Sequence, residues 1–218
     1  MNKLKLGALL VAGAVAFTSC KEDEKKEDNN SNNTPSVTAG ACEFFPIATG
    51  NLWIYEDGEG AIDTVRIGSS DTINGNTWFE VIDNDETGMI YCGPDFLYSW
   101  DESADPFSGE ANIAGSQRVV QKNPSVGQTW TDEFELNGNV TAVAKFTVKG
   151  VNITMDVKGT TYTDVIEIEL ESYARFNGQT GPSAFSTRWL SQGIGLIKYS
   201  FQDSTSNVVE ELIDFEFN

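Results

Sequence analysis

The sequence predicts an all-β fold, an antiparallel β-sandwich or barrel-like meander of about 10–12 strands in a single domain. From residue 44 onward, short runs of β-branched and aromatic residues are separated by Gly, Asn, Asp and Pro. Apolar and polar residues alternate within these runs, and few stretches fit the period of a helix. We expect strands at residues 53–55, 62–67, 77–83, 89–92, 96–100, 118–122, 128–136, 140–148, 161–172, 187–190, 194–202 and 208–217.

The alternation also predicts which side of each strand is buried. Even positions of residues 140–148 are apolar and odd positions are mostly polar, and residues 166–171 alternate Ile or Leu with Glu. One face of such a strand meets a core and the other meets water. The segments Asn74-Gly75-Asn76 and Asn137-Gly138-Asn139 supply residues that tolerate the positive φ of tight hairpins.

Three tryptophans, Trp53, Trp78 and Trp130, each follow a glycine by three positions. Glycine can adopt the turn conformation that starts a strand, and the indole then caps the core near the start of that strand. We therefore expect three structural hairpin entries. The alternative is an aromatic platform for a sugar or an apolar ligand.

The start of the chain resembles the signal of bacterial lipoproteins. Lys3 and Lys5 precede an apolar run over residues 6–17, which is too short to span a bilayer, and small residues then lead to Cys20. The resemblance implies that Cys20 becomes the lipidated first residue, with fatty acid such as palmitate. We expect residues 1–19 to be the signal peptide, residues 20–40 a lipidated cysteine with a disordered acidic tether, and residues 41–218 the all-β domain.

The residues that follow the cysteine resemble the export tag of surface lipoproteins from the Bacteroidetes group. They are Lys21, Glu22, Asp23 and Glu24. This resemblance implies a lipid-anchored protein of the outer membrane that faces the cell surface. Residues 25–36 add charged, Asn and Ser residues with no large apolar side chain, which is typical of a solvated spacer.

The charge balance excludes several partners. The chain has 14 Lys and Arg residues against 33 Asp and Glu residues, a formal net charge of -19. Such a field repels phosphate backbones, so we expect no nucleic-acid partner and a membrane contact made through lipid alone. The chain has no histidine, which excludes Ser-His triads and histidine metal sites. We expect no metal site and no cofactor.

Two cysteines remain once Cys20 is assigned to lipid. Cys42 and Cys92 form an even pair in an exported protein, which favours a disulfide. The alternative is two buried thiols that behave as small hydrophobic side chains.

Three sequence segments resemble a group of small Bacteroidetes lipoproteins. Their bodies run from a Pro-x-x-x-Gly-Asn-x-Trp start to a Gly-x-Gly-Leu-Ile/Val-Lys end, as residues 45–55, 126–130 and 189–198 do here. The resemblance covers about residues 44–217. It implies an all-β body and surface attachment, and it carries over no catalytic residue. A second resemblance is to lipocalins, which have Gly-x-Trp near the first barrel strand where this chain has Gly-x-x-Trp.

The acidic residues do not form a recognisable catalytic pattern. Glu167, Glu169 and Glu171 lie on one face of one predicted strand, about 7 Å apart, whereas glycosidases place two carboxyl groups on opposite sides of a sugar. We expect a solvated strand face and no catalytic residue. Tripeptides at Thr64, Thr72 and Ser204 resemble Bacteroidetes O-glycosylation acceptors.

These observations favour a noncatalytic, surface-tethered β lipoprotein that binds a protein or glycan partner or supports an outer-membrane assembly. One alternative is a lipocalin-like carrier, for which a large interior cavity lined by Trp, Phe and Ile would be needed. The other is a carboxylate-based glycan hydrolase, which needs two acids from different strands in one cleft.

Overall fold

The computed structural model describes residues 39–84, 86–101, 116–137, 139–202 and 207–218. A short 3-10 helix, η1 (Ala41–Phe44), precedes all the strands. The strands are β1 (Leu52–Asp57), β2 (Ile62–Ile73), β3 (Asn76–Asp83), β4 (Glu86–Cys92), β5 (Phe96–Asp101), β6 (Gln117–Gln121), β7 (Thr129–Asn137), β8 (Val140–Val157), β9 (Thr160–Phe176), β10 (Gln179–Ser191), β11 (Gly195–Gln202) and β12 (Asn207–Glu216).

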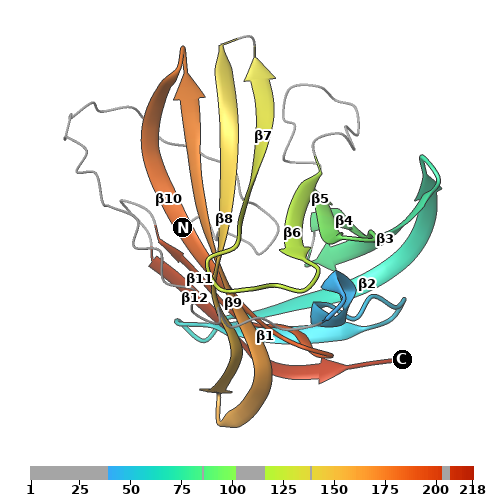
Figure 1. The fold of residues 1–218 in the computed structure, drawn as a ribbon. Helices are drawn as coiled ribbons and strands as arrows, with labels where there is room; N and C mark the ends of the chain where they lie inside the picture. Colours follow the sequence, from blue (N-terminus) through green and yellow to red (C-terminus); the bar gives the residue numbers. More distant parts are fainter. Residues whose placement is uncertain (1–38, 85, 102–115, 138, 203–206) are drawn as a thin grey trace.

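The strands form one antiparallel sheet of 12 members in the order β6-β5-β4-β3-β2-β1-β12-β11-β10-β9-β8-β7. The sheet curves into a barrel-like shape, in which β7 to β10 lie side by side as long ribbons (Figure 1). Strands that follow one another in sequence are neighbours except for β6 and β7, which form the two edges of the sheet, and β1 pairs with β12. The predicted all-β meander is therefore confirmed. The described residues contain no helix with the length and apolar character needed to cross a membrane.

The strand alternation has its predicted effect on burial. In β8, Phe146 and Val148 are fully buried, while Lys145 and Lys149 on the opposite face are exposed. The turn between β2 and β3 is also as expected, because Asn74 and Gly75 adopt φ values of 51° and 80°. The second predicted turn contains Gly138, which lies outside the described residues.

The hairpin between β8 and β9 is longer than its sequence pattern predicts. Both strands continue to a turn at Lys158-Gly159, with φ values of 49° and 83°. The alternation of this segment is hidden because the pairing register shifts near Gly150 and Ile153, and because Asn152 has a φ of 53°. Each such bulge moves an apolar residue to the other face of the strand.

The two edge strands, β6 and β7, are not paired through their backbones, but side-chain hydrogen bonds join them. The Nε of Arg118 donates to Asp132 Oδ1 at 2.6 Å, and the backbone N–H of Arg118 donates to Asp132 Oδ2 at 2.7 Å. The Trp130 indole donates to the Arg118 carbonyl at 2.8 Å. These contacts, which we call the seam, connect the edges of the rolled sheet and satisfy polar groups that an edge strand would expose.

The segment around η1 closes one end of the barrel, and we call residues 39–47 the plug. Ala39 and Asn123 exchange hydrogen bonds at the β6–β7 turn, through Asn123 Oδ1 at 3.1 Å and the Ala39 carbonyl at 2.8 Å. On the other side of the barrel, the Gly193 N–H donates to the Glu43 carbonyl at 2.6 Å. The plug thus spans from the β6–β7 turn to the β10–β11 turn. Its own Phe44 is fully buried in the core.

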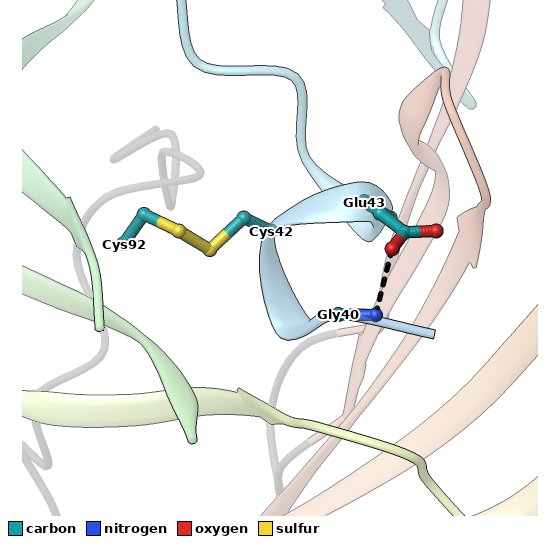
Figure 2. Close-up of a disulfide and its surroundings, with 4 residues drawn as sticks. All are labelled: Gly40, Cys42, Glu43 and Cys92. Carbon is teal, nitrogen blue, oxygen red and sulfur yellow. Dashed lines mark hydrogen bonds between the residues drawn. A yellow bond between two sulfur atoms is a disulfide. The ribbon is translucent and has the colours of Figure 1, made fainter. Parts of the chain in front are cut away.

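A disulfide fixes the plug to the sheet. Cys42 in η1 and Cys92 at the end of β4 are bonded, with their Cα atoms 5.7 Å apart (Figure 2). Beside it, the Gly40 N–H donates to Glu43 Oε1 at 2.9 Å, which holds the start of η1 (Figure 2). The cross-link closes a loop of 50 residues and so restricts the unfolded chain.

Candidate functional site

A row of polar side chains crosses the interior of the barrel on four neighbouring strands. Arg188 on β10 is paired with Tyr199 on β11, Tyr199 with Glu210 on β12, and Glu210 with Asp57 on β1. Directly paired residues point to the same face of a sheet. Arg188 is also paired with Ile168 on β9, which is fully buried in the core, so this face is the interior one. We call Arg188, Tyr199, Glu210 and Asp57 the charged row.

Glu210 is the most deeply buried acid of the row. It is 2% exposed, and its Oε2 atom has no hydrogen-bond partner in the part of the chain that the structure describes. Burial, followed by repulsion from Asp63, Asp83 and Asp57, raises the pKa of Glu210 to about 7. This carboxyl group therefore exchanges its proton near neutral pH, whereas an exposed glutamate is fully ionised there.

The acids around Glu210 are held by local hydrogen bonds. Asp57 Oδ1 accepts from the N–H groups of Glu59 and Ala61 at 2.9 and 2.7 Å, which stabilises the β1–β2 turn. The Asn84 amide donates to Asp63 Oδ1 at 2.7 Å and lies 3.4 Å from Asp83 Oδ1. These contacts hold the carboxylates of Asp57 and Asp63 in fixed positions on adjacent strands.

Arg188 lies at the other end of the charged row and has a different environment. Part of the residue keeps exposed surface, but its guanidinium is buried, and burial lowers the pKa of this group, an effect that Tyr199 partly opposes. Among the described residues, the Arg188 side chain takes part in no ion pair and no hydrogen bond. Its paired neighbours are Ile168 and Tyr199, so the acid nearest to it in the row is Glu210, two strands and about 10 Å away.

Small side chains line the interior next to Arg188. On β10, Ser186 and Ala184 share its face, and Ala184 is paired with Ser172 on β9, which is paired in turn with Ala144 on β8. Ser186 is 2% exposed, and its hydroxyl lies next to that of Tyr199, although no hydrogen bond of good geometry joins it to a partner within the described residues. We call Ala144, Ser172, Ala184 and Ser186 the small-residue wall.

The apolar interior is packed. Trp53, Phe44, Phe146, Ile168 and Leu170 are each 0% exposed. A side chain that lines a water-sized cavity keeps accessible surface, and these keep none. The described core therefore does not contain the Trp-, Phe- and Ile-lined cavity that an apolar carrier would need.

All three tryptophans that follow a glycine are buried, which confirms that they are structural. Trp53 and Trp130 belong to the main core, with their indole N–H groups bonded to the Ile194 and Arg118 carbonyls. Trp78 is 2% exposed and contacts Tyr91 on the outer face of β3 and β4, at a centroid distance of 5.2 Å.

That outer face does not offer a flat platform for a sugar. Tyr91 stacks on Tyr98 at 5.6 Å with an angle of 20° between the rings. Stacked rings cover each other's faces, whereas a sugar needs an uncovered ring face to pack against. The outer aromatic residues are therefore a packed ladder.

The other predicted site residues lie apart from the charged row. Glu169 and Glu171 are on the outer face of β9 and pair with Lys149 at 3.2 Å and Lys145 at 3.5 Å. The expected solvated strand face is confirmed. Among the described residues, no three acidic or cysteine side chains are placed to hold a metal ion.

The predicted modification sites are placed as follows. Thr72 is exposed on β2, and Thr64 is half-buried on the same strand. Ser204, the lipidation residue Cys20 and the tag residues 21–24 lie outside the described residues.

Sequence patterns did not indicate the charged row. Arg188 shares the inward face of β10 with Ser186 and Ala184, so no apolar pattern marks it, and Glu210 shares the inward face of β12 with Leu212. A polar residue at an inward position is the available signal, but the register that aligns Arg188 with Tyr199 depends on a bulge in β10, and the one that aligns Glu210 with Asp57 depends on a bulge in the β1–β12 pair. Periodicity does not predict those bulges.

Comparison with known proteins gives limited information. No family model matches the chain, and no curated protein matches it. One similar solved structure is a candidate lipoprotein from Parabacteroides distasonis ATCC 8503, with 11% identity and a TM-score of 0.45 over 79% of this chain and 98% of that one. Another is a candidate exported protein with a YmcC-like fold from Bacteroides fragilis NCTC 9343, with 10% identity and a TM-score of 0.46 over 80% of this chain and 99% of that one. At these similarities, neither relative indicates what this chain binds.

Proposed function

We propose that this protein is a lipid-anchored, noncatalytic β-barrel of the outer-membrane surface that binds a protein or glycan partner at the end of the barrel opposite the plug. One observation carries the proposal: the chain enters the barrel at the plugged end. Ala39, the first described residue, is bonded on both of its backbone groups to Asn123. A tether that leads back from Ala39 to Cys20 therefore attaches to the plug.

The opposite end, which we call the distal end, is formed by the β1–β2, β3–β4, β7–β8 and β9–β10 turns. The charged row reaches this end at Asp57, next to the β1–β2 turn. A flexible chain of 19 residues, the number from Cys20 to the residue before Ala39, has an end-to-end distance of about 25 Å, which is enough to hold the barrel clear of lipid headgroups. The distal end is then the part of the domain that can face outward.

A catalytic role is less well supported. Glu210 has the raised pKa that a general acid needs. However, Glu210 and Asp83 are only 2% and 5% exposed, so a glycan cannot reach either carboxyl group. Both also lie on the same curved wall, whereas a glycosidase places its acids on two sides of the sugar.

The anchor is tested by replacing Cys20→Ala in the native host, with Ser36→Ala in the same tether as the matched control. We expect the control to remain in the carbonate-washed membrane fraction and Cys20→Ala to be released, because the lipid is the membrane contact. A Cys20→Ala protein that persists in washed membranes would contradict the anchor.

Surface exposure is tested by neutralising the tag with Glu22→Gln, Asp23→Asn and Glu24→Gln. We expect an external protease to digest the barrel on intact cells carrying the unaltered protein, and to spare it when the tag is neutral. Equal digestion of the two proteins would refute the role of the tag, and protection of the unaltered protein would refute the surface location.

A further inference from the structure

The edge strand β7 is longer than the seam that joins it to β6. β7 is the last strand of the sheet and pairs only with β8. The seam reaches β7 at Asp132 and at Thr131, whose carbonyl accepts from Arg118 Nη2 at 2.6 Å. β6 begins at Gln117, and the ribbon of β7 extends past this point (Figure 1). Within the described residues, no strand therefore pairs with the outer side of residues 133–137, which we call the free edge.

The free edge presents backbone hydrogen-bonding groups away from β8. In an antiparallel pair, the N–H and C=O of one residue point to the same side, and this side alternates along the strand. The Thr131 carbonyl points toward β6, because it accepts from Arg118. The β7–β8 register is regular from Thr129 to Glu135, so the N–H and C=O groups of Glu133 and Glu135 point the same way as those of Thr131. Unpaired groups of this kind are a template for a further strand.

The side chains of the free edge differ between its two faces. Phe134 lies on the inner face, where it is half-buried and packs against the core beside Ala142 of β8. Glu133 and Glu135 lie on the outer face and are exposed. Glu133 is bonded to Arg175 at 2.6 Å, whereas Glu135 has no ion pair among the described residues. A strand added here would meet an apolar ring on one face and an unpaired carboxylate on the other.

We propose that the free edge of β7 binds an extended strand of a partner protein in which cationic and apolar side chains alternate. This inference rests on the proposed function, because it specifies the partner bound at the distal end, to which the β7–β8 turn belongs. Backbone hydrogen bonds to Glu133 and Glu135 supply affinity, and alternate side chains supply specificity. A cationic side chain on the outer face meets Glu135 and the net charge of -19, and an apolar one on the inner face covers Phe134.

A second copy of this chain fits the free edge less well than a cationic strand. Two free edges that pair with each other bring Glu133 and Glu135 of one copy beside the same two residues of the other. Like charges on neighbouring strands destabilise a sheet. Each copy also carries a net charge of -19, which opposes their association. A partner strand with Lys or Arg on its outer face removes both costs.

The test uses the full chain, purified in a non-ionic detergent, and fluorescence anisotropy at physiological salt. The probe is a labelled synthetic peptide of about six residues in which lysine and valine alternate. A control peptide of the same composition has its lysines and its valines in separate blocks, so it has the same charge but no alternation. We expect saturable binding of the alternating peptide, and binding of the block peptide weaker by about tenfold or more. Equal affinity of the two peptides, or no saturable binding up to about 1 mM, would overturn the proposal.

The variant that assigns the site is Glu135→Pro. The N–H of Glu135 points away from β8, so proline removes the donor offered to the peptide and leaves the β7–β8 ladder in place. The matched control is Glu135→Ala, which removes the same carboxylate but keeps the N–H. We expect peptide affinity to fall about tenfold or more in Glu135→Pro and at most about threefold in Glu135→Ala. Equal affinity of the two variants would overturn the backbone pairing.

Sedimentation of the same samples tests whether a second copy occupies the free edge. We expect the unaltered protein to be a monomer in the absence of the peptide. A dimer that Glu135→Pro dissociates would assign the free edge to a second copy and overturn the proposal.

A charge reversal covers the case in which Glu135→Pro does not fold. Glu135→Lys puts a cation beside the bound lysines, and Glu216→Lys makes the same change at an exposed position of β12. We expect peptide affinity to fall about fivefold or more in Glu135→Lys and to stay within about twofold in Glu216→Lys. Equal affinity of these two variants would overturn the site. A surface-anchored protein that does not bind the alternating peptide contradicts this inference alone, whereas a peptide-binding protein found inside the cell contradicts only the proposed function.

Discussion

The plug and the charged row differ in whether their buried polar groups have hydrogen-bond partners. Beneath the plug, the Trp53 indole donates to the Ile194 carbonyl at 2.7 Å, and the Tyr55 hydroxyl donates to the Leu196 carbonyl at 2.9 Å. In the charged row, Glu210 Oε2 has no partner and Arg188 has no counter-charge within the described residues. Satisfied polar groups in a core specify the structure, whereas unsatisfied ones reduce stability.

This difference indicates a division of tasks within one sheet. The plugged end carries the disulfide, the stacked Phe45–Trp53 pair at 4.8 Å and a close approach of Gly195 to the Trp53 indole. Gly195 has a φ of 109°, and a Cβ there would lie 3.2 Å from Trp53 Nε1, so glycine is needed. The plugged end satisfies its polar groups, whereas the charged row holds a buried carboxyl oxygen, Glu210 Oε2, without a hydrogen-bond partner in the described part of the chain.

The largest expected effect is at the plug. Trp53→Ala removes a fully buried indole together with its hydrogen bond to Ile194, and it should lower the free energy of unfolding by about 3–5 kcal/mol. Urea denaturation followed by far-UV circular dichroism measures the change. A loss below about 1 kcal/mol would show that the plugged end is not tightly packed.

The next effect is that of the disulfide. Replacing both Cys42 and Cys92 by Ser opens a loop of 50 residues, and in the chain-entropy model it costs about 4 kcal/mol. Thermal unfolding of the double variant should match that of the unaltered protein under reducing conditions. A reduced protein that unfolds at the same temperature as the oxidised one would contradict the stabilising role of the cross-link.

Replacing Glu210 should raise the free energy of unfolding, in contrast to the two replacements above. Its pKa of about 7 lies above the ordinary value of 4.5, so the folded protein holds this proton more tightly than the unfolded chain does. Below pH 4.5 both states are protonated and Glu210 costs nothing. Stability then falls as the pH rises to about 7, and above that the cost is constant at up to about 3 kcal/mol. Glu210→Gln should therefore stabilise the protein at pH 8 and leave it unchanged at pH 4.

The control for this prediction is Glu211→Gln, at the next position on the outer face. Glu211 accepts a hydrogen bond from Lys198 at 2.7 Å, so its loss should cost about 0.2–1 kcal/mol.

The groups that face Glu210 are Asp57, Asp63, Asp83, Tyr55 and Tyr199. A Glu210→Gln protein with no gain in stability between pH 4 and pH 8 would show that this row does not strain the fold.

The smallest effect concerns the seam. Asp132→Asn weakens both of the hydrogen bonds that Arg118 makes to the carboxylate, and it should lower the free energy of unfolding by about 1–2 kcal/mol. Glu133→Gln is the control, because Glu133 is 53% exposed and its ion pair with Arg175 should contribute less than about 1 kcal/mol. Equal effects in chemical denaturation would show that the seam is not a structural link.

The sequence predicted the fold better than the site. All 12 described strands overlap the expected runs, because alternation and turn residues act locally. The hairpin at Lys158-Gly159 and the start of β10 at Gln179 were missed, since bulges break the alternation there. Cys42 and Cys92 were paired by counting cysteines, which needs no register.

The site depends on information that a local pattern does not contain. Arg188 and Glu210 come together only through the order of β10, β11 and β12 and the exact register of each pair. The lack of a counter-charge at Arg188 is a property of all the strands around it, so no segment of the sequence shows it.

The stability of Arg188→Met tests most directly whether the charged row differs from the plug in its contribution to the fold. Since Arg188 has no partner among the described residues, replacing it by an apolar side chain of similar length should leave the free energy of unfolding unchanged or raise it. Urea denaturation of Arg188→Met beside the unaltered protein gives the answer. The account predicts equal or greater stability, and a loss of more than about 2 kcal/mol would contradict it by showing that Arg188 supports the fold.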